Sequence, residues 1–343
     1  WALGCQAVIK GDAVICVPEQ ETVEIEFVTK TVGAERVALA AEFDGDIDPS
    51  VRRAHVAIEA PSLDDQTTDW DRLLRELSLQ HDVQDVSANL SMLRSLARDL
   101  REAEWNVTAV LEMGDSVAHP LDHPRLLDLL PGDQSDRCYG VAIDIGTTSN
   151  VIYLVDLLTG RVIDRASAYN AQISAGEDVI SRIIFSQKRD GLQRLQKMVL
   201  KTLNGLLEEL TSRNQIPTRQ ISKAVVAGNT TMLQLFLALD PTSIRQMPFV
   251  PTIGQPLGVT AGELGLNINP QAEVDCLPVV GAYVGADITA GVLASGMYDT
   301  DALTLFIDVG TNGELVLGNR DWLITCACSA GPAFEGSGVR HGM

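Results

Sequence analysis

A phrase of nine residues that occurs twice is the feature that most constrains the fold of this chain. Residues 141–149 read VAIDIGTTS, and residues 305–313 read LFIDVGTNG. In each copy an apolar run reaches Asp, Gly-Thr follows, and a second apolar run begins, which predicts a strand, a tight turn and an antiparallel return strand. Glycine lets backbone N–H groups in such a turn approach an anion, and a concave group of N–H donors suits phosphate. The duplication therefore predicts two similar lobes that face one phosphoanhydride.

The chemistry of the two phrases suggests a role for each residue type. A carboxylate at the end of a strand can hold hydrated Mg²⁺ against a phosphate, so we expect Asp144 and Asp308 to organise Mg²⁺ and water for hydrolysis. A further turn that follows an apolar strand, at residues 228–230, is expected to face the same cleft. The residues expected to contact the nucleotide are Gly146, Thr147, Thr148, Gly228, Asn229, Thr230, Gly310, Thr311, Asn312, Gly313, Gly331 and Gly336.

Three charged residues near these turns have more than one interpretation. Asp287 and Glu335 lie beside Gly-rich turns, where each could orient a water or cap a helix. For Arg182, in a helix that follows the first lobe's strands, a surface salt bridge is favoured over a functional role. The sequence leaves the roles of all three open.

Composition narrows the class of protein. The chain has 343 residues, of which 45% are hydrophobic and only 5% aromatic, as in a soluble α/β protein of two or three domains. No apolar run approaches the ~20 residues that span a bilayer, so we expect a cytoplasmic protein without a membrane partner. The net charge is −20, and residues 1–136 hold 27 acidic and 11 basic residues. A solvated acidic face is favoured over a docking surface, and the lack of a basic cluster argues against nucleic-acid binding.

The six cysteines lack the spacing of a disulfide framework, which fits a reducing compartment. Cys326 and Cys328 alternate in an apolar strand, and this pattern favours packing of one thiol in the core over metal ligation.

Along the chain the pattern changes twice. Short extended runs fill residues 1–28, and residues 29–136 form a small acidic α+β domain with strands at 36–42, 55–59 and 107–111 and helices at 69–79 and 87–104. Residues 137–343 alternate strands with long helices, with a first lobe at about 137–300 and a second lobe from about 301. Helices are predicted at 177–187, 192–213 and 281–293, and a buried strand at 223–227. Only seven residues follow the segment that ends at Gly336, so we expect the second lobe to be incomplete and its nucleotide binding to be weakened.

Six ordered motifs give the chain a family resemblance. The paired phosphate phrases resemble the clan of acetate and sugar kinases, chaperone ATPases and actin. More narrowly, the chain resembles the ATP-dependent reductive activators of corrinoid proteins, whose linker and middle region are similar to residues 61–74. The six motifs are YGVAIDIGTT (139–148), DVISRI (178–183), VAGNTTM (226–232), YVGAD (283–287), IDVGTNGE (307–314) and AGPAFEG (330–336).

The resemblance implies both fold and function. It implies an actin-like, ribonuclease H-like two-lobed ATPase module, preceded by a small α+β domain and by the tail of a β-grasp ferredoxin domain. The intact protein would use ATP, Mg²⁺ and a [2Fe-2S] cluster to pass an electron to a Co(II) corrinoid and restore Co(I). Its partners would be a corrinoid protein and a low-potential electron donor, and a homodimer is left open.

By the same resemblance, Cys5 stands in the place of the last cluster ligand, and the C-x₄-C-x₂-C spacing that should precede it is absent. One cysteine cannot hold a cluster, so we expect these 343 residues alone not to transfer electrons. The chain also departs from the family at residues 170–178 (NAQISAGED), which leaves the role of that loop uncertain. Trp1 opens the chain in mid-pattern, and we expect an upstream part.

Two other functions remain open at this stage. A small-molecule kinase of the same clan would need an acceptor pocket with a general base, and none is evident. A non-catalytic module could close its lobes around a partner when ATP binds. Phosphate release without a phosphorylated product would exclude the kinase, and nucleotide binding without turnover would favour the switch.

Overall fold

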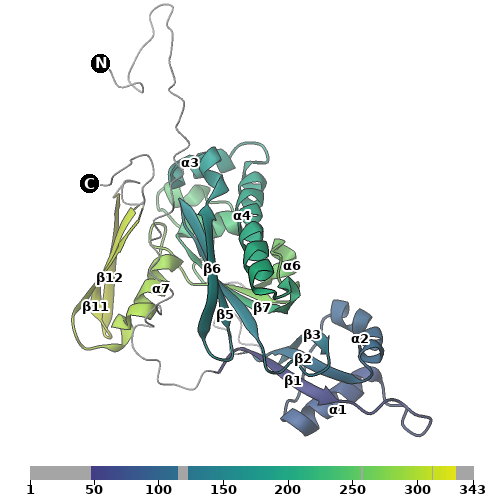
Figure 1. The fold of residues 1–343 in the computed structure, drawn as a ribbon. Coiled ribbons are helices and arrows are strands. Elements are labelled where there is room, and N and C mark those ends of the chain that lie inside the picture. Colours follow the sequence, from purple (N-terminus) through teal and green to yellow (C-terminus); the bar gives the residue numbers. More distant parts are fainter. Residues whose placement is uncertain (1–47, 115–122, 256–257, 311, 330–343) are drawn as a thin grey trace, which may run out of the picture. The chain divides into compact units, whose positions relative to one another are not determined.

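A computed structural model describes residues 48–114, 123–255, 258–310 and 312–329 (Figure 1). Its contacts group residues 44–343 into one unit, separate from residues 1–43. Three sheets and the helices that cover them make up the described residues, which confirms the α/β prediction. The segment at 1–28 and the strand predicted at 36–42 lie outside the described residues.

The first sheet belongs to a small α+β layer. It is antiparallel in the order β1-β2-β3, with β1 (Val51–Ala57), β2 (Asn106–Glu112) and β3 (Arg125–Pro131). Helices α1 (Asp69–His81) and α2 (Leu90–Glu102) pack against it through four buried leucines, Leu73, Leu77, Leu96 and Leu100. Thr68 and Asn89 cap the first turns of the two helices through side-chain oxygens. Both predicted helices and the strand at 107–111 are confirmed; β1 begins earlier than the predicted 55–59, and β3 was not predicted.

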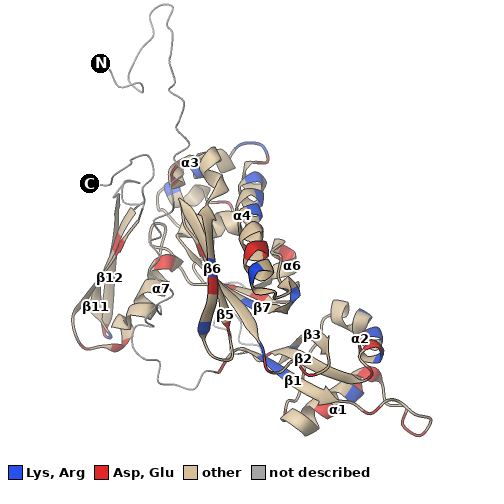
Figure 2. Cartoon of the chain, in the orientation of Figure 1, with Lys and Arg blue, Asp and Glu red and all other residues tan. Residues whose placement is uncertain are grey.

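Charged side chains of both signs lie together on these two helices (Figure 2). Arg101 of α2 reaches Asp69 of α1 at 2.7 Å, and Arg98 contacts Asp99 at 2.9 Å. Exposed pairs of this kind stabilise by less than about 1 kcal/mol each. The acidity in the described part of this layer is therefore partly balanced by neighbouring arginines.

The central sheet has six strands in the order β6-β5-β4-β7-β9-β8. β4, β7 and β9 are parallel, whereas β4, β5 and β6 form an antiparallel meander and β8 is antiparallel to β9. The bounds are β4 (Tyr139–Ile145), β5 (Ser149–Asp156), β6 (Arg161–Tyr169), β7 (Ile221–Gly228), β8 (Gly258–Thr260) and β9 (Glu273–Cys276). The antiparallel half follows from two consecutive hairpins, of which the first phosphate phrase forms the first, and the parallel strands β4, β7 and β9 are joined by crossovers that contain helices.

Two helices of this module, α3 and α4, begin and end near the predicted residues, whereas the helix predicted at 281–293 begins only at Ala286. The α-helices are α3 (Val179–Ser186), α4 (Gly191–Asn214), α5 (Thr230–Phe236), α6 (Ala261–Leu264) and α7 (Ala286–Ser295), with short 3-10 helices η2 (Ala171–Ala175), η3 (Thr218–Gln220), η4 (Thr242–Arg245) and η5 (Met297–Asp299). In α4, Leu195, Val199, Leu203 and Leu210 are buried along one stripe and pack on the meander (Figure 1).

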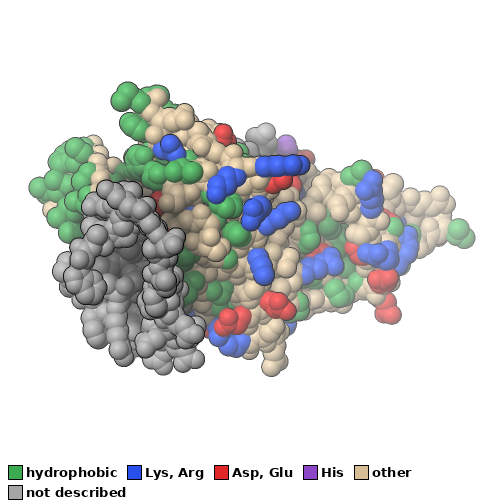
Figure 3. Space-filling view, turned by 90° about the horizontal axis from the view of Figure 1, so that it is seen from above, with side chains coloured by type: hydrophobic (Ala, Val, Ile, Leu, Met, Phe, Trp, Pro, Cys, Tyr) green, Lys and Arg blue, Asp and Glu red, His purple; other side chains and the backbone are tan. Residues whose placement is uncertain are grey.

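The third sheet carries the second phosphate phrase. β10 (Thr304–Val309), β11 (Asn312–Asn319) and β12 (Trp322–Ser329) form an antiparallel meander, and α7 contacts β10 and β11 as well as β7. Apolar side chains such as Leu305, Ile307 and Ile324 are exposed on this sheet, and Figure 3 shows hydrophobic side chains gathered at the left edge, where it lies. In the described part of the chain no helix is both long and apolar enough to cross a membrane.

Candidate nucleotide site

The first phosphate phrase folds as the predicted hairpin. β4 ends at Ile145, β5 begins at Ser149, and the N–H of Gly146 donates to the Ser149 carbonyl at 3.0 Å. A Cβ on Gly146 would lie 2.4 Å from that carbonyl oxygen, so only glycine fits this turn. Asp144 is exposed one residue before the end of β4, whereas Thr147 and Thr148 are buried.

The turn at residues 228–230 lies beside this hairpin. Ile145 pairs with Gly228 across the parallel β4–β7 ladder, so the two strands end side by side. Asn229 caps α5 by accepting from the N–H of Met232, and its Nδ2 donates to Thr147 Oγ1 at 2.9 Å. The two groups predicted to share one cleft, 146–148 and 228–230, are therefore brought together.

Buried polar side chains contact the first turn on the side that faces the protein interior. Asn170 donates from Nδ2 to the Gly146 carbonyl at 2.9 Å and from its backbone N–H to the Thr148 carbonyl at 2.8 Å. Arg182 donates from Nη2 to the Thr147 carbonyl at 2.5 Å. The surface salt bridge favoured for Arg182 was wrong, because its side chain is fully buried and its partners are carbonyls, an amide and a sulfur.

The second phosphate phrase forms the equivalent hairpin between β10 and β11. The N–H of Gly310 donates to the Asn312 carbonyl at 2.8 Å, and Asp308 and Gly313 lie in the paired strands on either side. Asp308 is half-buried, unlike Asp144. The predicted site residues Cys5, Thr311, Gly331 and Gly336, as well as Glu335, lie outside the described residues.

The start of α7 lies against the turn at residues 228–230, and the helix also contacts the second hairpin. A Cβ on Gly285 would lie 2.4 Å from the Asn229 Cα and 2.7 Å from the Thr230 N, so α7 begins directly against the turn that holds Thr147. Two residues later, burial raises the pKa of Asp287 to about 6, and the negative charge of Asp308 adds to this rise. The N-cap of α7 is Gly285, so Asp287 is not the cap that the sequence left open.

A cavity of about 530 Å³ adjoins the second turn. Its lining comprises residues 280–284 before α7, Asn312 of β11 and residues 325–328 of β12. Cavities of this size hold small ligands. The prediction that a thiol of Cys326 or Cys328 packs in the core was wrong, because both cysteines are exposed and line this cavity; Cys328 Sγ donates to the Gly313 carbonyl at 3.1 Å.

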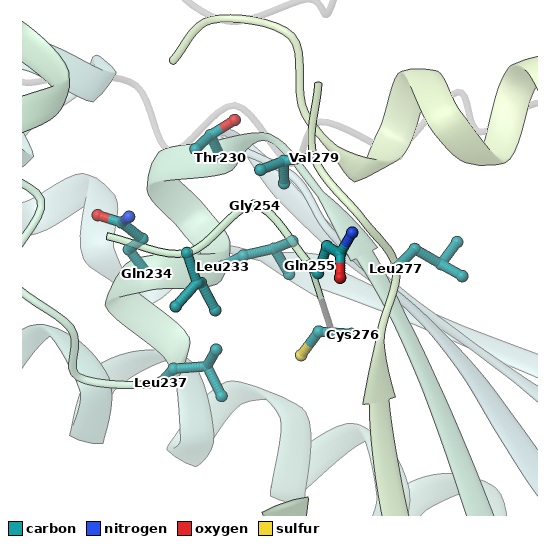
Figure 4. Close-up of a pocket in the computed structure, with 10 residues that line it drawn as sticks. Thr230, Leu233, Gln234, Leu237, Gly254, Gln255, Cys276, Leu277 and Val279 are labelled. Carbon is teal, nitrogen blue, oxygen red and sulfur yellow. The ribbon is translucent and has the colours of Figure 1, made fainter. Parts of the chain in front are cut away.

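A second cavity, of about 10 Å³, lies behind α5 and has room for about one water molecule. Figure 4 shows Leu233 and Leu237, at α5 and its end, around it together with Cys276 of β9. Burial raises the pKa of Cys276 to about 12, so this thiol stays protonated. The cavity is part of the packing that supports α5.

The chain is similar to known proteins along most of its length. Profiles described as the RACo linker region, the RACo middle region and the C-terminal domain of RACo, the ASKHA domain, match residues 40–136, 139–300 and 302–343. Among curated proteins, the corrinoid activation enzyme RamQ of Eubacterium limosum is 36% identical over 221 residues, covering 64% of this chain and 37% of RamQ. A [Co(II) methylated amine-specific corrinoid protein] reductase of Methanosarcina barkeri is 28% identical over 218 residues, covering 60% of this chain and 38% of that protein.

The chain is also similar to a solved structure. A reductive activator for corrinoid, iron-sulfur protein is 44% identical, with a TM-score of 0.77, over 88% of this chain and 47% of that protein. The chain therefore spans less than half the length of each of these relatives. The ASKHA match confirms the actin-like fold class, and the three consecutive profiles follow the order linker, middle region and C-terminal domain. The chain belongs to the RACo family, whose three profiles match it one after another in this order.

Proposed function

We propose that this module binds Mg²⁺-ATP between the turns of its two phosphate hairpins. The proposal rests on the position of the start of α7. Gly285 packs against the turn that contains Asn229, and the negative charge of Asp308 helps to raise the pKa of Asp287. The start of α7 thus links the turn at 228–230, which lies beside the first hairpin, with the second hairpin. A phosphate chain bound at both turns would contact both hairpins, and a shift of either hairpin would also shift α7.

The proposed Mg²⁺ ligands are Asp144 and Asp308. Among the described residues no group of three or more His, Cys, Asp or Glu could hold a metal ion. Mg²⁺ is commonly bound through one or two carboxylates, with phosphates and waters completing the octahedron, so a sparse donor set fits Mg²⁺. When bound, Mg²⁺ would neutralise phosphate charge. Asp287 would lie beside the cation that Asp308 holds, and the repulsion between these two carboxylates would fall when the cation binds.

The remaining proposed contacts are those of the two turns and of the cavity beside the second turn. The turns at 146–148 and 310–313 would present backbone N–H groups to phosphates, and the cavity beside Asn312 would receive another part of the nucleotide. Gly331 and Gly336 remain our candidates for the nucleoside side. Catalysis at such a site consists of positioning and charge neutralisation.

We further propose that the intact protein couples this nucleotide to the reduction of a Co(II) corrinoid protein to Co(I). Support comes from membership of the RACo family and from the relatives of Eubacterium limosum and Methanosarcina barkeri, whose names specify corrinoid activation and Co(II) corrinoid reduction. We propose that residues 1–28 are the tail of a [2Fe-2S] domain with Cys5 as a cluster ligand, and that residues 29–136 join it to the ATPase module. A low-potential donor would supply the electron.

ATP turnover with and without a Co(II) corrinoid protein tests this assignment. We expect the intact protein to release phosphate, faster when the corrinoid protein is present, without phosphorylating it or a small acceptor. A phosphorylated product would identify a kinase instead. Tight ATP binding with no phosphate release in either condition would identify a non-catalytic switch.

A further inference from the structure

A buried guanidinium lies directly behind the first phosphate turn. Arg182 of α3 is fully buried, and its Nη2 donates to the Thr147 carbonyl. Its Nε donates to the Gly176 carbonyl at 2.9 Å, and its Nη1 contacts Gln172 Oε1 at 3.3 Å and Met232 Sδ at 3.0 Å. One side chain therefore joins the turn, the η2 segment and α5.

These contacts fix the direction of the turn's peptide groups. In a planar trans peptide the C=O of one residue and the N–H of the next point in opposite directions. Arg182 holds the Thr147 carbonyl toward the interior, and Asn170 holds the Gly146 carbonyl in the same way. The N–H groups of Thr148 and Thr147 are consequently aimed away from Arg182 and Asn170.

The charge of Arg182 is not cancelled by a close carboxylate. None of the described ion pairs involves Arg182, and the carboxylate that raises its pKa is Asp178 at the N-cap of α3. Burial lowers the pKa to about 10, so the guanidinium is still protonated at neutral pH. A buried unit charge is screened much less than a surface one, and an anion in front of the turn would feel it.

We propose that Arg182 is a positioning residue for ATP, which holds the peptide groups of the first turn in their phosphate-binding direction and supplies a buried positive charge behind them. This inference rests on the proposed binding of nucleotide. Arg182 itself is fully buried, so it acts through the Thr147 carbonyl and touches no ligand. Gln172 supports it by accepting from Nη1 while donating to the Leu195 carbonyl at 2.9 Å.

Three ligands separate this role from simple structural support. ATP with Mg²⁺, tripolyphosphate and adenosine would be titrated against the 343-residue chain and its Arg182→Met and Arg182→Lys variants. Met matches the length of the apolar stem and removes the charge. We expect Arg182→Met to raise the Kd of ATP and of tripolyphosphate about tenfold and to leave adenosine unchanged. Arg182→Lys keeps the charge but loses the forked geometry of the guanidinium group. Its Kd values for ATP and tripolyphosphate should therefore lie between those of Arg182→Met and the wild type.

The matched control is Arg189→Met, which removes an arginine seven residues along whose side chain is 98% exposed; it should change none of the three Kd values. The proposal is overturned if Arg182→Met binds ATP like wild type, or if all three ligands weaken by the same factor. Should Arg182→Met fail to fold, an unchanged ratio of ATP to adenosine affinity in Arg182→Lys overturns it. If the wild type binds neither ATP nor tripolyphosphate, the proposed nucleotide site itself fails, and this inference fails with it.

Discussion

Asp144 and Asp308 end equivalent strands, yet their surroundings differ. Asp144 is exposed, whereas Asp308 is half-buried and electrostatically linked to Asp287. The sequence could predict the pair because the two phrases repeat the same residue types at the same spacing. It could not predict Asp287 as a neighbour, since that contact depends on how α7 packs.

Removing either carboxylate tests the assignment of Mg²⁺ ligands. We expect Asp144→Ala and Asp308→Ala each to lower ATP turnover roughly 10²-fold or more. Mg²⁺ then loses a ligand, and the charge of the phosphates is less well neutralised. Thermal unfolding without nucleotide should change little for Asp144→Ala, whose side chain is exposed. Asp321→Ala, at an exposed turn, is the control. Unchanged turnover in both variants would contradict the assignment.

The raised pKa of Asp287 predicts that the stability of the folded protein depends on pH. Its pKa in the folded protein, about 6, lies above its ordinary value of 3.8. The folded state therefore binds more protons than the unfolded state between these values, and stability falls as pH rises from about 4 to about 6. Asp287→Asn should remove that loss and raise the free energy of unfolding at pH 7.5 by on the order of 2 kcal/mol in the absence of Mg²⁺.

Urea unfolding at pH 4.5 and pH 7.5 measures this effect. The same variant should bind Mg²⁺-ATP more weakly, since it removes a negative charge beside the proposed ligand Asp308. Equal loss of stability with pH in the variant and the wild type would show that Asp287 is not the group responsible.

At the scale of elements, α7 shows where sequence reasoning stops. The run of small residues predicted a helix at 281–293, but α7 spans Ala286–Ser295. Residues 280–284 form a loop because Thr230 Oγ1 donates to the Gly281 carbonyl and the Val280 N–H donates to the Val284 carbonyl. Local helix propensity is overridden here by a contact with α5, more than 50 residues away in sequence. By contrast, α1, α2 and α4 follow their apolar stripes and were predictable.

The contact between α7 and the Asn229 turn can be tested with one methyl group. Gly285→Ala would place a Cβ 2.4 Å from the Asn229 Cα, and backbone on both sides must move. We expect a loss of about 1 to 3 kcal/mol in unfolding free energy, together with weaker ATP binding. Denaturant unfolding and ATP titration measure the two effects.

Gly205→Ala is the matched control. Gly205 lies inside α4, where a methyl group in place of its hydrogen would have nothing within 4 Å. There, alanine should raise stability by about 0.5 to 1 kcal/mol and leave ATP binding unchanged. If Gly285→Ala behaves like Gly205→Ala, α7 is not held against the turn as described.

At the scale of the whole molecule, a buried charged cluster joins the α+β layer to the central sheet. Lys223 of β7 lies 3.0 Å from Glu112 of β2, 3.4 Å from Glu273 and 2.9 Å from Asp275, both of β9. All four side chains are largely buried, and β7 runs from Lys223 to the turn at Gly228. Sequence reasoning missed this cluster, because its members are scattered over more than 160 residues and no local pattern marks them.

Lys223→Met should leave three buried carboxylates without their cation. We expect a loss of about 3 to 5 kcal/mol in unfolding free energy at pH 8. Burial already raises the pKa of Glu112, and without the lysine this carboxyl group should protonate more readily. The loss should therefore shrink as pH is lowered to 5, because protonation of Glu112 then removes one of the buried negative charges.

Chemical unfolding at the two pH values measures this dependence. Lys197→Met, which removes an exposed lysine of α4, should show no comparable loss. A destabilisation of Lys223→Met that is the same at pH 5 and pH 8 would show that unpaired charge is not its cause.

The central claim is that nucleotide at the paired turns drives corrinoid reduction in the intact protein. The most direct test is the visible spectrum of a Co(II) corrinoid protein mixed with the intact protein and a low-potential reductant. We predict that the Co(I) signal develops only when Mg²⁺-ATP is added, and that Asp144→Ala abolishes this dependence. Formation of Co(I) at the same rate without ATP, or no Co(I) with it, would contradict this claim.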